Sequence, residues 1–402
     1  MAQTARVRLH PRHRIDAGAA DVAFAAWACL GARGRRAWSP AADTLACLSA
    51  RSGLDLLLGA LDLPPASEVL VSAVTIPDMA RIVCDHGLVP VPVDLDPATM
   101  APRLDLLDRL ATDRTRAVLV AHLFGGRLDL MPVVAWCRRR GLVLVEDCAQ
   151  SWRGPGDTGT AGADASLFSF GPIKTATAFG GGLVRVGDPA LLARMRRRHE
   201  EWPAQARLSF AARVAKCGAL VALQHPAAYG LAAAAADRLG HPLDAVVGRA
   251  ARSCPDWRRR PSAALLAVLR RRLARFDAGR LARRAARGET AADALAGVVE
   301  VPGTEQPERT WWLFPVAVDD PAFLVGRLRA AGIDASAATS KLAAVPAPAG
   351  RPEADPAVAR ALLARLVCLP AYPELPERAF LRMLDVVRQA QARERADWRA
   401  RA

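Results

Sequence analysis

The chain has 402 residues, of which 52% are hydrophobic and 5% aromatic, and its formal net charge is +15. This length allows two or three domains with a large buried core. A basic protein can bind nucleic acid, but the densest basic run, 257–288, carries leucines at helical spacing and no nucleic-acid-binding motif. We therefore expect a globular protein whose arginines cover solvated helix faces and that binds no nucleic acid.

The first half of the chain alternates strand-like and helix-like segments. Apolar, strand-like runs occupy 44–49, 68–75, 88–95, 117–125 and 142–150, and the segments between them include helical patterns over 51–61 and 76–87. This rhythm predicts a mostly parallel sheet covered by helices on both sides. Ligands of such sheets bind at the carboxyl ends of the strands, where His122, Asp147 and Gln150 stand.

The second half has a different pattern. Alanine-rich helical segments fill 203–256, a basic helix is expected over 257–288, and a strand at 310–318 and a last helix over about 378–399 follow. We predict a large domain over 1–256, which includes a helical insertion at 203–256. The remainder, 257–402, is expected to hold a linking basic helix and a small α+β domain.

Cysteine spacing and the N-terminus indicate the compartment. The eight cysteines stand singly, without a C-x-x-C pair, which argues against a zinc site or a disulfide framework. The N-terminal residues lack an apolar signal core, and charges interrupt the other apolar stretches before they reach the roughly 20 residues that cross a bilayer. We expect a cytoplasmic protein without a structural metal.

The stretch SLFSFGPIKTATAFGGGLVRV, over 166–186, contains one of only three lysines in a chain with 52 arginines. Arginine supplies a surface positive charge equally well, but its guanidinium stays protonated. A buried lysine amine can lose its proton and attack a carbonyl. Lys174 is therefore a candidate for covalent chemistry.

Each other candidate residue has an ordinary structural interpretation. Asp147 could cap a helix, His122 could be a hydrogen-bonded core histidine, Ser169 could be a strand serine, and the glycines at 180–182 could form a tight turn. Together with Lys174 they match the needs of pyridoxal phosphate (PLP). The lysine would form a Schiff base, a buried carboxylate would keep the pyridine nitrogen protonated, and hydroxyl and N–H groups would hold the phosphate.

The segments EVLVSAVTIPDMARIV, AVLVAHLFGG, LVLVEDCAQSW, ASLFSFGPIKTATAFGGGLV and LVCLPAYPEL carry a resemblance to a known family. The chain resembles the sugar aminotransferases of the DegT–StrS type, fold-type I PLP enzymes that mostly aminate keto groups of nucleotide-linked sugars. The resemblance implies a mostly parallel seven-stranded sheet in the large domain, a small C-terminal α+β domain, and a homodimer with shared sites.

The resemblance also assigns roles. It implies that Lys174 forms the Schiff base, that Asp147 pairs with the pyridine nitrogen, and that Gln150 approaches the phenolic oxygen of the cofactor. Ser169 would bind the phosphate, and His122 lies in the motif HLFG that family members place beside the cofactor.

Three positions depart from the family pattern. Arg51 and Ser52 stand where the family usually has a serine-glycine-threonine sequence, so Ser52, the helix N–H groups and the Arg51 charge would meet the phosphate. Ile76 replaces the aromatic residue that commonly stacks on the pyridine ring. Arg258 stands near the position of the asparagine that the neighbouring subunit contributes in the family.

We predict a PLP-dependent aminotransferase that moves an amino group from an amino acid, glutamate in the first place, to a nucleotide-linked keto sugar. Such reactions serve glycan or secondary-metabolite biosynthesis. The altered Arg51, Ile76 and Arg258 positions motivate an alternative, a catalytically idle paralogue that acts as a scaffold. Family dehydratases replace the lysine with histidine, so a dehydratase does not fit Lys174.

The segment 203–256 makes the chain longer than family members usually are. Within it, 208–224 is an imperfectly amphipathic helix with polar and apolar faces, and a second helix follows Pro226. One interpretation is a helical hairpin packed on the domain or on the dimer partner. The other is peripheral contact of 207–240 with an anionic membrane surface.

Overall fold

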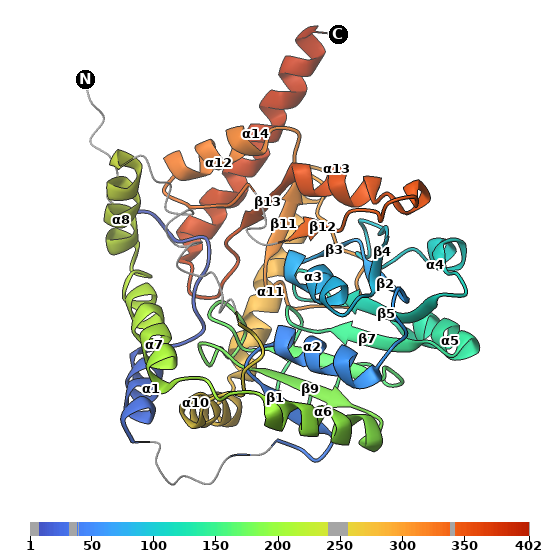
Figure 1. Ribbon diagram of the computed structural model, residues 1–402. Helices are drawn as coiled ribbons and strands as arrows, with labels where there is room; N and C mark the ends of the chain where they lie inside the picture. Colours follow the sequence, from blue (N-terminus) through green and yellow to red (C-terminus); the bar gives the residue numbers. More distant parts are fainter. Residues whose placement is uncertain (1–7, 32–37, 39, 240–255, 338–341, 402) are drawn as a thin grey trace.

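The computed structural model describes residues 8–31, 38, 40–239, 256–337 and 342–401 (Figure 1). Lys341, Cys254 and the end of the 203–256 segment lie outside the described residues.

A seven-stranded sheet forms the centre of the chain. β9 runs antiparallel to both of its neighbours, and the other strands of this sheet pair in parallel, which confirms the predicted mostly parallel sheet. In spatial order the strands are β1 (Thr44–Cys47), β9 (Gly182–Val186), β8 (Ala165–Ser169), β7 (Val143–Asp147), β5 (Thr115–Ala121), β2 (Glu68–Ser72) and β4 (Val89–Val93).

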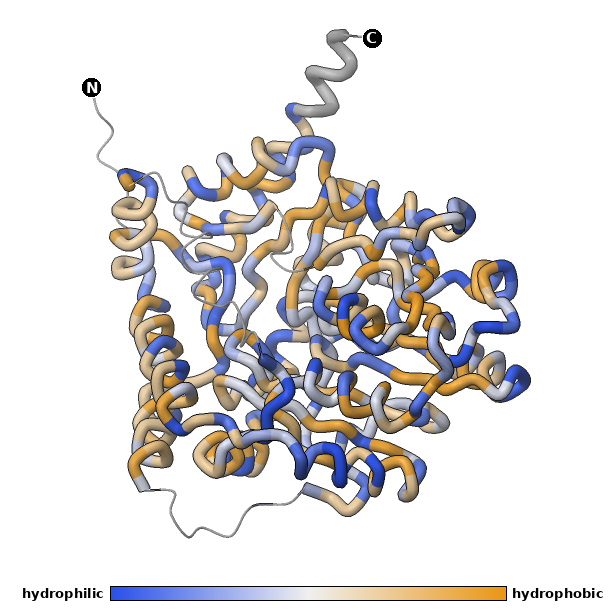
Figure 2. The backbone as a smooth tube through the Cα atoms, viewed as in Figure 1, coloured by the Kyte–Doolittle hydropathy of each residue, from blue (hydrophilic) through white to orange (hydrophobic). Residues whose placement is uncertain are grey.

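Helices cover both faces of this sheet, because its strands are apolar on both sides. In β2, for example, Val69 and Val71 pack in one apolar cluster with α2 and α6, whereas Leu70 packs in another with α4 and α5. Figure 2 shows hydrophobic residues along these central strands. The helices are α2 (Ala50–Leu61), α3 (Pro77–Asp85), α4 (Leu104–Leu110), α5 (Met131–Arg140) and α6 (Pro189–Glu201).

A second apolar core belongs to the C-terminal part of the chain, where β11 (Phe314–Ala317) and β13 (Leu366–Leu369) pair antiparallel. Helices surround this pair. Figure 1 shows three of them at one end of the molecule above the large sheet, whereas the first in chain order runs down through the middle of the view. The helices are α11 (Ala278–Leu295), α12 (Pro321–Ala330), α13 (Ala357–Arg365) and α14 (Glu377–Arg401).

The basic run 257–288 was expected to be one helix, and this expectation is wrong. The structure has α10 (Ala263–Ala274) and then α11, with a break between them. The break occurs where Asp277 adopts an extended backbone and its carboxylate accepts the backbone N–H of Arg280 at 2.8 Å. Aspartate is favoured at such helix N-caps, so the sequence starts a new helix there.

The helices α1 (Ala19–Gly31), α7 (Arg207–Ala222) and α8 (Pro226–Arg238) lie along one edge of the molecule (Figure 1). Phe210, Val214 and Cys217 of α7 are buried in a core that includes residues of α1 and α10. The axes of α7 and α8 differ by 106°, so the two helices are sharply bent relative to each other, and α7 packs on the domain as one interpretation expected. Among the described helices, none alone is long and apolar enough to cross a membrane, although this bent pair passes that test of length and composition when taken together.

Four short strands form two further antiparallel pairs outside the seven-stranded sheet. β6 (Gly126–Arg127) pairs with β10 (Glu308–Arg309), and β3 (Val74–Thr75) pairs with β12 (Ala343–Ala344). Both pairs join the large sheet region to the C-terminal half, close to the strand ends where the candidate site lies.

Candidate active site

Three parallel strands bring the predicted site residues to one edge of the sheet. Asp147 is the last residue of β7, Ser169 is the last residue of β8, and His122 directly follows β5. Ala121 pairs with Asp147 in the sheet register, so the two strands end side by side. Carboxyl ends of parallel strands are where ligands of α/β sheets bind, and the sequence prediction placed the site at this edge.

Lys174 lies in the turn that follows β8, where its backbone N–H donates to the Gly171 carbonyl at 3.0 Å. A Cβ built on Gly171 would lie 3.8 Å from Ser169 Oγ and 3.9 Å from Lys174 Cγ. The serine hydroxyl and the lysine side chain therefore flank the same short stretch of backbone.

The Nζ atom of Lys174 lies 4.0 Å from the centre of the Trp312 ring, a cation–π distance. The indole N–H of Trp312 donates to the Ile173 carbonyl at 2.9 Å, which fixes the ring beside the lysine. Gly125 permits this arrangement, because a Cβ on it would come within 2.3 Å of the Trp312 backbone nitrogen. The glycines of HLFGG thus let the turn after β5 dock on the segment that carries Trp312.

Asp147 has the environment that a pyridinium partner needs. Its side chain is buried, and one carboxylate oxygen accepts the backbone N–H of Ala149 at 2.9 Å. Burial raises the pKa of Asp147, while the nearby positive charge of Lys174 acts in the opposite direction. Among the described residues the Lys174 charge acts on this carboxylate, but no ion pair to it is found, so a protonated ring nitrogen would supply a direct charge partner.

Gln150 follows three residues after Asp147, and its Oε1 accepts the backbone N–H of Phe124 at 2.9 Å. This bond orients the amide, so the remaining polar group of the side chain is its NH₂ donor. Such a donor suits a phenolic oxygen.

The N-terminus of α2 offers the candidate phosphate site. Ser49 caps the helix by accepting the backbone N–H of Ser52 at 3.2 Å, and the two hydroxyl oxygens lie 3.0 Å apart. Arg51 Nη1 lies 2.5 Å from Asp78 Oδ2 in the first turn of α3. Ile76 is the N-cap residue of that helix and packs partly buried against the large-domain core. The buried Ser52 hydroxyl is thus bonded within the protein, while the N–H groups of the helix start remain suited to an anion.

Arg258, near the position where the family has its inter-subunit asparagine, has a partner within its own chain. Its Nη2 atom lies 2.9 Å from Asp55 Oδ1, and the same carboxylate also bonds His86 at 3.1 Å. Asp55 lies one turn into α2 beyond the phosphate site, so this pairing holds Arg258 on the helix.

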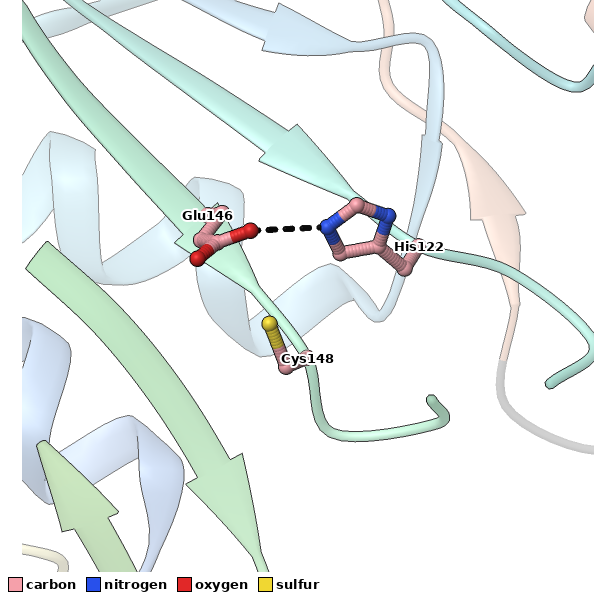
Figure 3. Close-up of side chains that lie close together, drawn as sticks. All are labelled: His122, Glu146 and Cys148. Atoms are coloured by element: carbon pink, nitrogen blue, oxygen red, sulfur yellow. Dashed lines mark hydrogen bonds and ion pairs between the residues drawn. The ribbon is translucent and has the colours of Figure 1, made fainter. Parts of the chain in front are cut away.

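His122 is held by both of its ring nitrogens, and Figure 3 shows the bond of one of them to Glu146. Nδ1 accepts the backbone N–H of Leu128 at 3.1 Å, so Nε2 carries the proton and donates it to Glu146 Oε2 at 2.9 Å. Burial lowers the pKa of His122, which keeps the ring neutral. Both hydrogen-bonding nitrogens of the ring are therefore bonded to groups of the protein itself.

Glu146 is the centre of this network and was not singled out from the sequence. Burial alone would raise its pKa, but the hydrogen bonds from His122, Ser166 and Thr160 outweigh this effect and hold the pKa at about 2. Cys148 lies close to His122 and Glu146 in Figure 3, within distances that could suit a metal ion. The guanidinium of Arg127 instead contacts both Glu146, at 3.4 Å, and Cys148, so the group is a hydrogen-bond network that fixes the ends of β5 and β7.

A pocket beside Lys174 is lined by residues that the sequence prediction missed. They come from four separate segments of the chain, and their common feature is positive charge or aromatic character: Arg12, His13, Arg14, Arg280, Arg284, Trp312 and Tyr372. Nothing in the local pattern of these segments places them together, because tertiary packing alone brings the N-terminal residues and α11 to the lysine.

The N-terminal segment reaches this pocket because it is tied at several points. Leu9 donates its N–H to the Pro226 carbonyl at 3.0 Å, and His10 pairs with Ile333. Arg12 Nε lies 2.6 Å from Asp334 Oδ2, and the pair is largely buried. The segment thus runs from α8 across the C-terminal core to the pocket.

Comparisons with known proteins show the family of the chain. The sequence model of the DegT/DnrJ/EryC1/StrS aminotransferase family matches residues 36–213 and 261–388. The chain belongs to this family. The cofactor of the family is pyridoxal phosphate, for which the residues around Lys174 and Asp147 provide a fitting environment. The matched parts leave out 214–260, which covers most of the segment expected to be an insertion.

Several relatives give the family assignment detail. The chain is 30% identical over 357 residues to the dTDP-3-amino-3,4,6-trideoxy-alpha-D-glucose transaminase of Streptomyces venezuelae, covering 85% of this chain and 81% of that protein. It is 35% identical over 156 residues to the GDP-perosamine synthase of Caulobacter vibrioides, a match to 38% of this chain and 42% of that protein. Several curated relatives are thus matched over less than half of their length.

Among solved structures, DesV of S. venezuelae in complex with a ketimine intermediate superposes with a TM-score of 0.63 at 26% identity. The superposition covers 92% of this chain and 94% of that chain. This similarity confirms a fold-type I architecture around the mostly parallel seven-stranded sheet.

Proposed function

We propose that the protein is an aminotransferase that moves the amino group of an amino acid, glutamate in the first place, to the keto group of a nucleotide-linked sugar. The observation that carries the proposal is a buried carboxylate, Asp147, that ends β7 beside Lys174 without an ion pair among the described residues. Relatives named as nucleotide-sugar transaminases and synthases support the substrate class.

The predicted site residues would divide the binding and the chemistry among them. Pyridoxal phosphate, when bound, supplies an electron sink for the carbon that carries the amine. Asp147 would hold the proton on the ring nitrogen, and Gln150 would donate to the phenolic oxygen. Lys174 would hold the cofactor aldehyde, then remove and return the proton of the reacting carbon. Ser169 and the start of α2, with Ser52 and Arg51, would hold the phosphate.

We propose other roles for His122 and Ile76 than the sequence prediction gave them. His122 has both nitrogens engaged by Leu128 and Glu146, so we propose that it positions the cofactor-binding edge of the sheet and does not exchange protons. Ile76 would contribute an apolar contact near the ring, since it caps α3 beside Arg51 and its partner Asp78.

The test combines the cofactor-loaded protein, glutamate and a nucleotide-linked keto sugar. We expect one amino sugar and one keto acid for each turnover, detected by mass spectrometry, and no product with Lys174→Arg. A protein that binds the cofactor yet fails to exchange the α-hydrogen of any amino acid would be the idle paralogue, an alternative for which the comparisons give no support.

We also propose a cytoplasmic homodimer, and a division of the chain into a large domain over 1–256 and a small domain with its linking helices over 257–402. The separate apolar core of the C-terminal strands and helices supports this division. Sedimentation at working concentration tests the dimer, and an active monomer would contradict it.

A peripheral membrane contact through 207–240 is the remaining proposal. Leu208 and Leu231 are 82% and 60% exposed, and Arg207 and Lys216 add positive charge on α7. Leu208→Ser with Leu231→Ser would leave the buried residues of α7 in place and should abolish co-sedimentation with anionic vesicles. Equal, negligible sedimentation of both proteins would instead leave the packed segment without a membrane role.

A further inference from the structure

One arginine in the pocket beside Lys174 has no charge partner in the part of the chain that the structure describes. The other three are paired. Arg12 pairs with Asp334 and Arg14 with Glu374, at 3.7 Å, and Arg280 lies 2.7 Å from Glu374 and 3.3 Å from Asp16. Arg284 is 6% exposed, and no described carboxylate lies within 4.0 Å of its guanidinium.

The hydrogen bonds of Arg284 go to neutral groups. Nε donates to the Thr310 carbonyl at 2.9 Å, and Nη2 donates to the Thr175 hydroxyl at 3.1 Å. These bonds hold the guanidinium in place beside Thr175, the residue that follows Lys174. Burial, together with the neighbouring Arg280 charge, lowers the pKa of Arg284 to about 10, so the group remains a cation at neutral pH.

A buried guanidinium that is held in place without a carboxylate partner lowers the stability of the folded protein, unless a bound anion neutralises its charge. Arg284 lines the same pocket as Lys174 and bonds Thr175, the next residue, so an anion that it binds in the pocket would lie on the side of the lysine amine. An amino acid carries its α-carboxylate on the very carbon that carries the amine. The diphosphate of a nucleotide sugar is separated from the keto carbon by the sugar ring, which places it further away.

We propose that Arg284 binds the α-carboxylate of the amino-acid donor and so selects amino acids over simple amines. This assignment rests on the proposed aminotransferase function and names the residue that recognises its donor. Trp312, which lies against Lys174 and lines the pocket, would cover the donor's apolar part.

The test follows the visible absorbance of the cofactor-loaded protein in single turnovers, with glutamate and with propylamine, which lacks a carboxylate. For Arg284→Gln we expect the glutamate concentration at half-maximal rate to rise about 10- to 100-fold, because one charge-assisted pair is lost. The reaction with propylamine should stay unchanged, and Arg284→Lys should restore part of the glutamate affinity. Arg283→Gln is the matched control, since Arg283 is adjacent on α11 but 63% exposed and paired with Asp277.

Calorimetry with succinate supplies a readout that needs no turnover. Succinate should bind the wild-type protein and Arg283→Gln, but not Arg284→Gln. If Arg284→Gln slows the reactions of glutamate and propylamine equally, Arg284 only connects Thr175 and Thr310 structurally. If the variant instead loses affinity for the cofactor, Arg284 belongs to the cofactor site. Either result overturns the proposal. A protein that binds succinate through Arg284 but converts no amino donor would refute the proposed function alone.

Discussion

At the scale of single residues, Asp147 has two opposing requirements. In its proposed role Asp147 would have to be ionised to pair with the ring nitrogen, whereas burial disfavours that charge and raises the pKa of the side chain. A folded-state pKa above the unfolded value means that the ionised group costs stability at neutral pH, and this cost disappears as the pH falls below the unfolded pKa. The site therefore holds a destabilising charge that the bound cofactor offsets.

We predict that Asp147→Asn lowers the transamination rate by about 100-fold or more, because the ring nitrogen loses its proton-holding partner. The cofactor-free variant should melt at the wild-type temperature or above it, since the buried charge is gone. Calorimetric melting and single-turnover kinetics check both parts, with exposed Asp105→Asn as control. Near wild-type turnover would show that another acid serves the ring.

Glu146 gives a prediction about pH. Its pKa of about 2 lies below the value of about 4.3 in an unfolded chain, so its ionised form stabilises the folded protein at all pH values above about 4. Glu146→Gln should cost about 3 kcal/mol at neutral pH, because a buried hydrogen-bonded charge is removed from His122 and Arg127.

The measurement is urea unfolding of both proteins across pH. The stability difference should shrink as the pH falls from about 4 towards 2, where Glu146 of the wild type takes up its proton. A difference that stays constant over this range would mean that the carboxylate charge is not what holds the network.

At the scale of elements, the turn after β5 connects the sheet to the C-terminal half. Gly125 has a φ of +93°, and an added Cβ would meet the Trp312 backbone at 2.3 Å. The turn therefore fixes the aromatic residue that lies against Lys174.

Gly125→Ala should destabilise the protein by about 2–3 kcal/mol through overpacking. It should also slow the donor reaction by about 10- to 100-fold, because Trp312 is displaced from the lysine. Gly141→Ala is the matched control: Gly141 also has a positive φ, +64°, but no described atom within 4 Å of an added Cβ. This control should cost about 1 kcal/mol and leave activity unchanged. Equal loss of activity in both variants would contradict the role given to the turn.

The elements also show why part of the site was predictable. Strand ends are local features, so the apolar runs that contain His122 and Asp147 near their ends placed these residues at one edge of the sheet. Arg12, Arg284 and Trp312 reach Lys174 only through packing of segments far apart in the sequence, and their local patterns carry no sign of it. The break between α10 and α11 had a local signal in Asp277, which the run of arginines and leucines obscured.

At the scale of the whole molecule, the site joins three parts: the edge of the large sheet, the N-terminal segment tied to Asp334, and α11 of the C-terminal half. Binding of a cofactor to such a junction stabilises the folded chain as a whole. At a cofactor concentration about 100 times the dissociation constant, the free energy of unfolding should rise by about 2.7 kcal/mol. Thermal melts with and without cofactor measure this, and an unchanged melting temperature would mean that the cofactor does not bind the folded state.

The most direct test of the central claim is borohydride reduction of the protein after incubation with pyridoxal phosphate. The account predicts a yellow protein whose visible band disappears on reduction, with the cofactor mass attached to Lys174 in the peptide digest. Prior addition of glutamate should remove the band and prevent the labelling. A protein that stays colourless with the cofactor supplied, or that carries the label on a lysine other than Lys174, would contradict it.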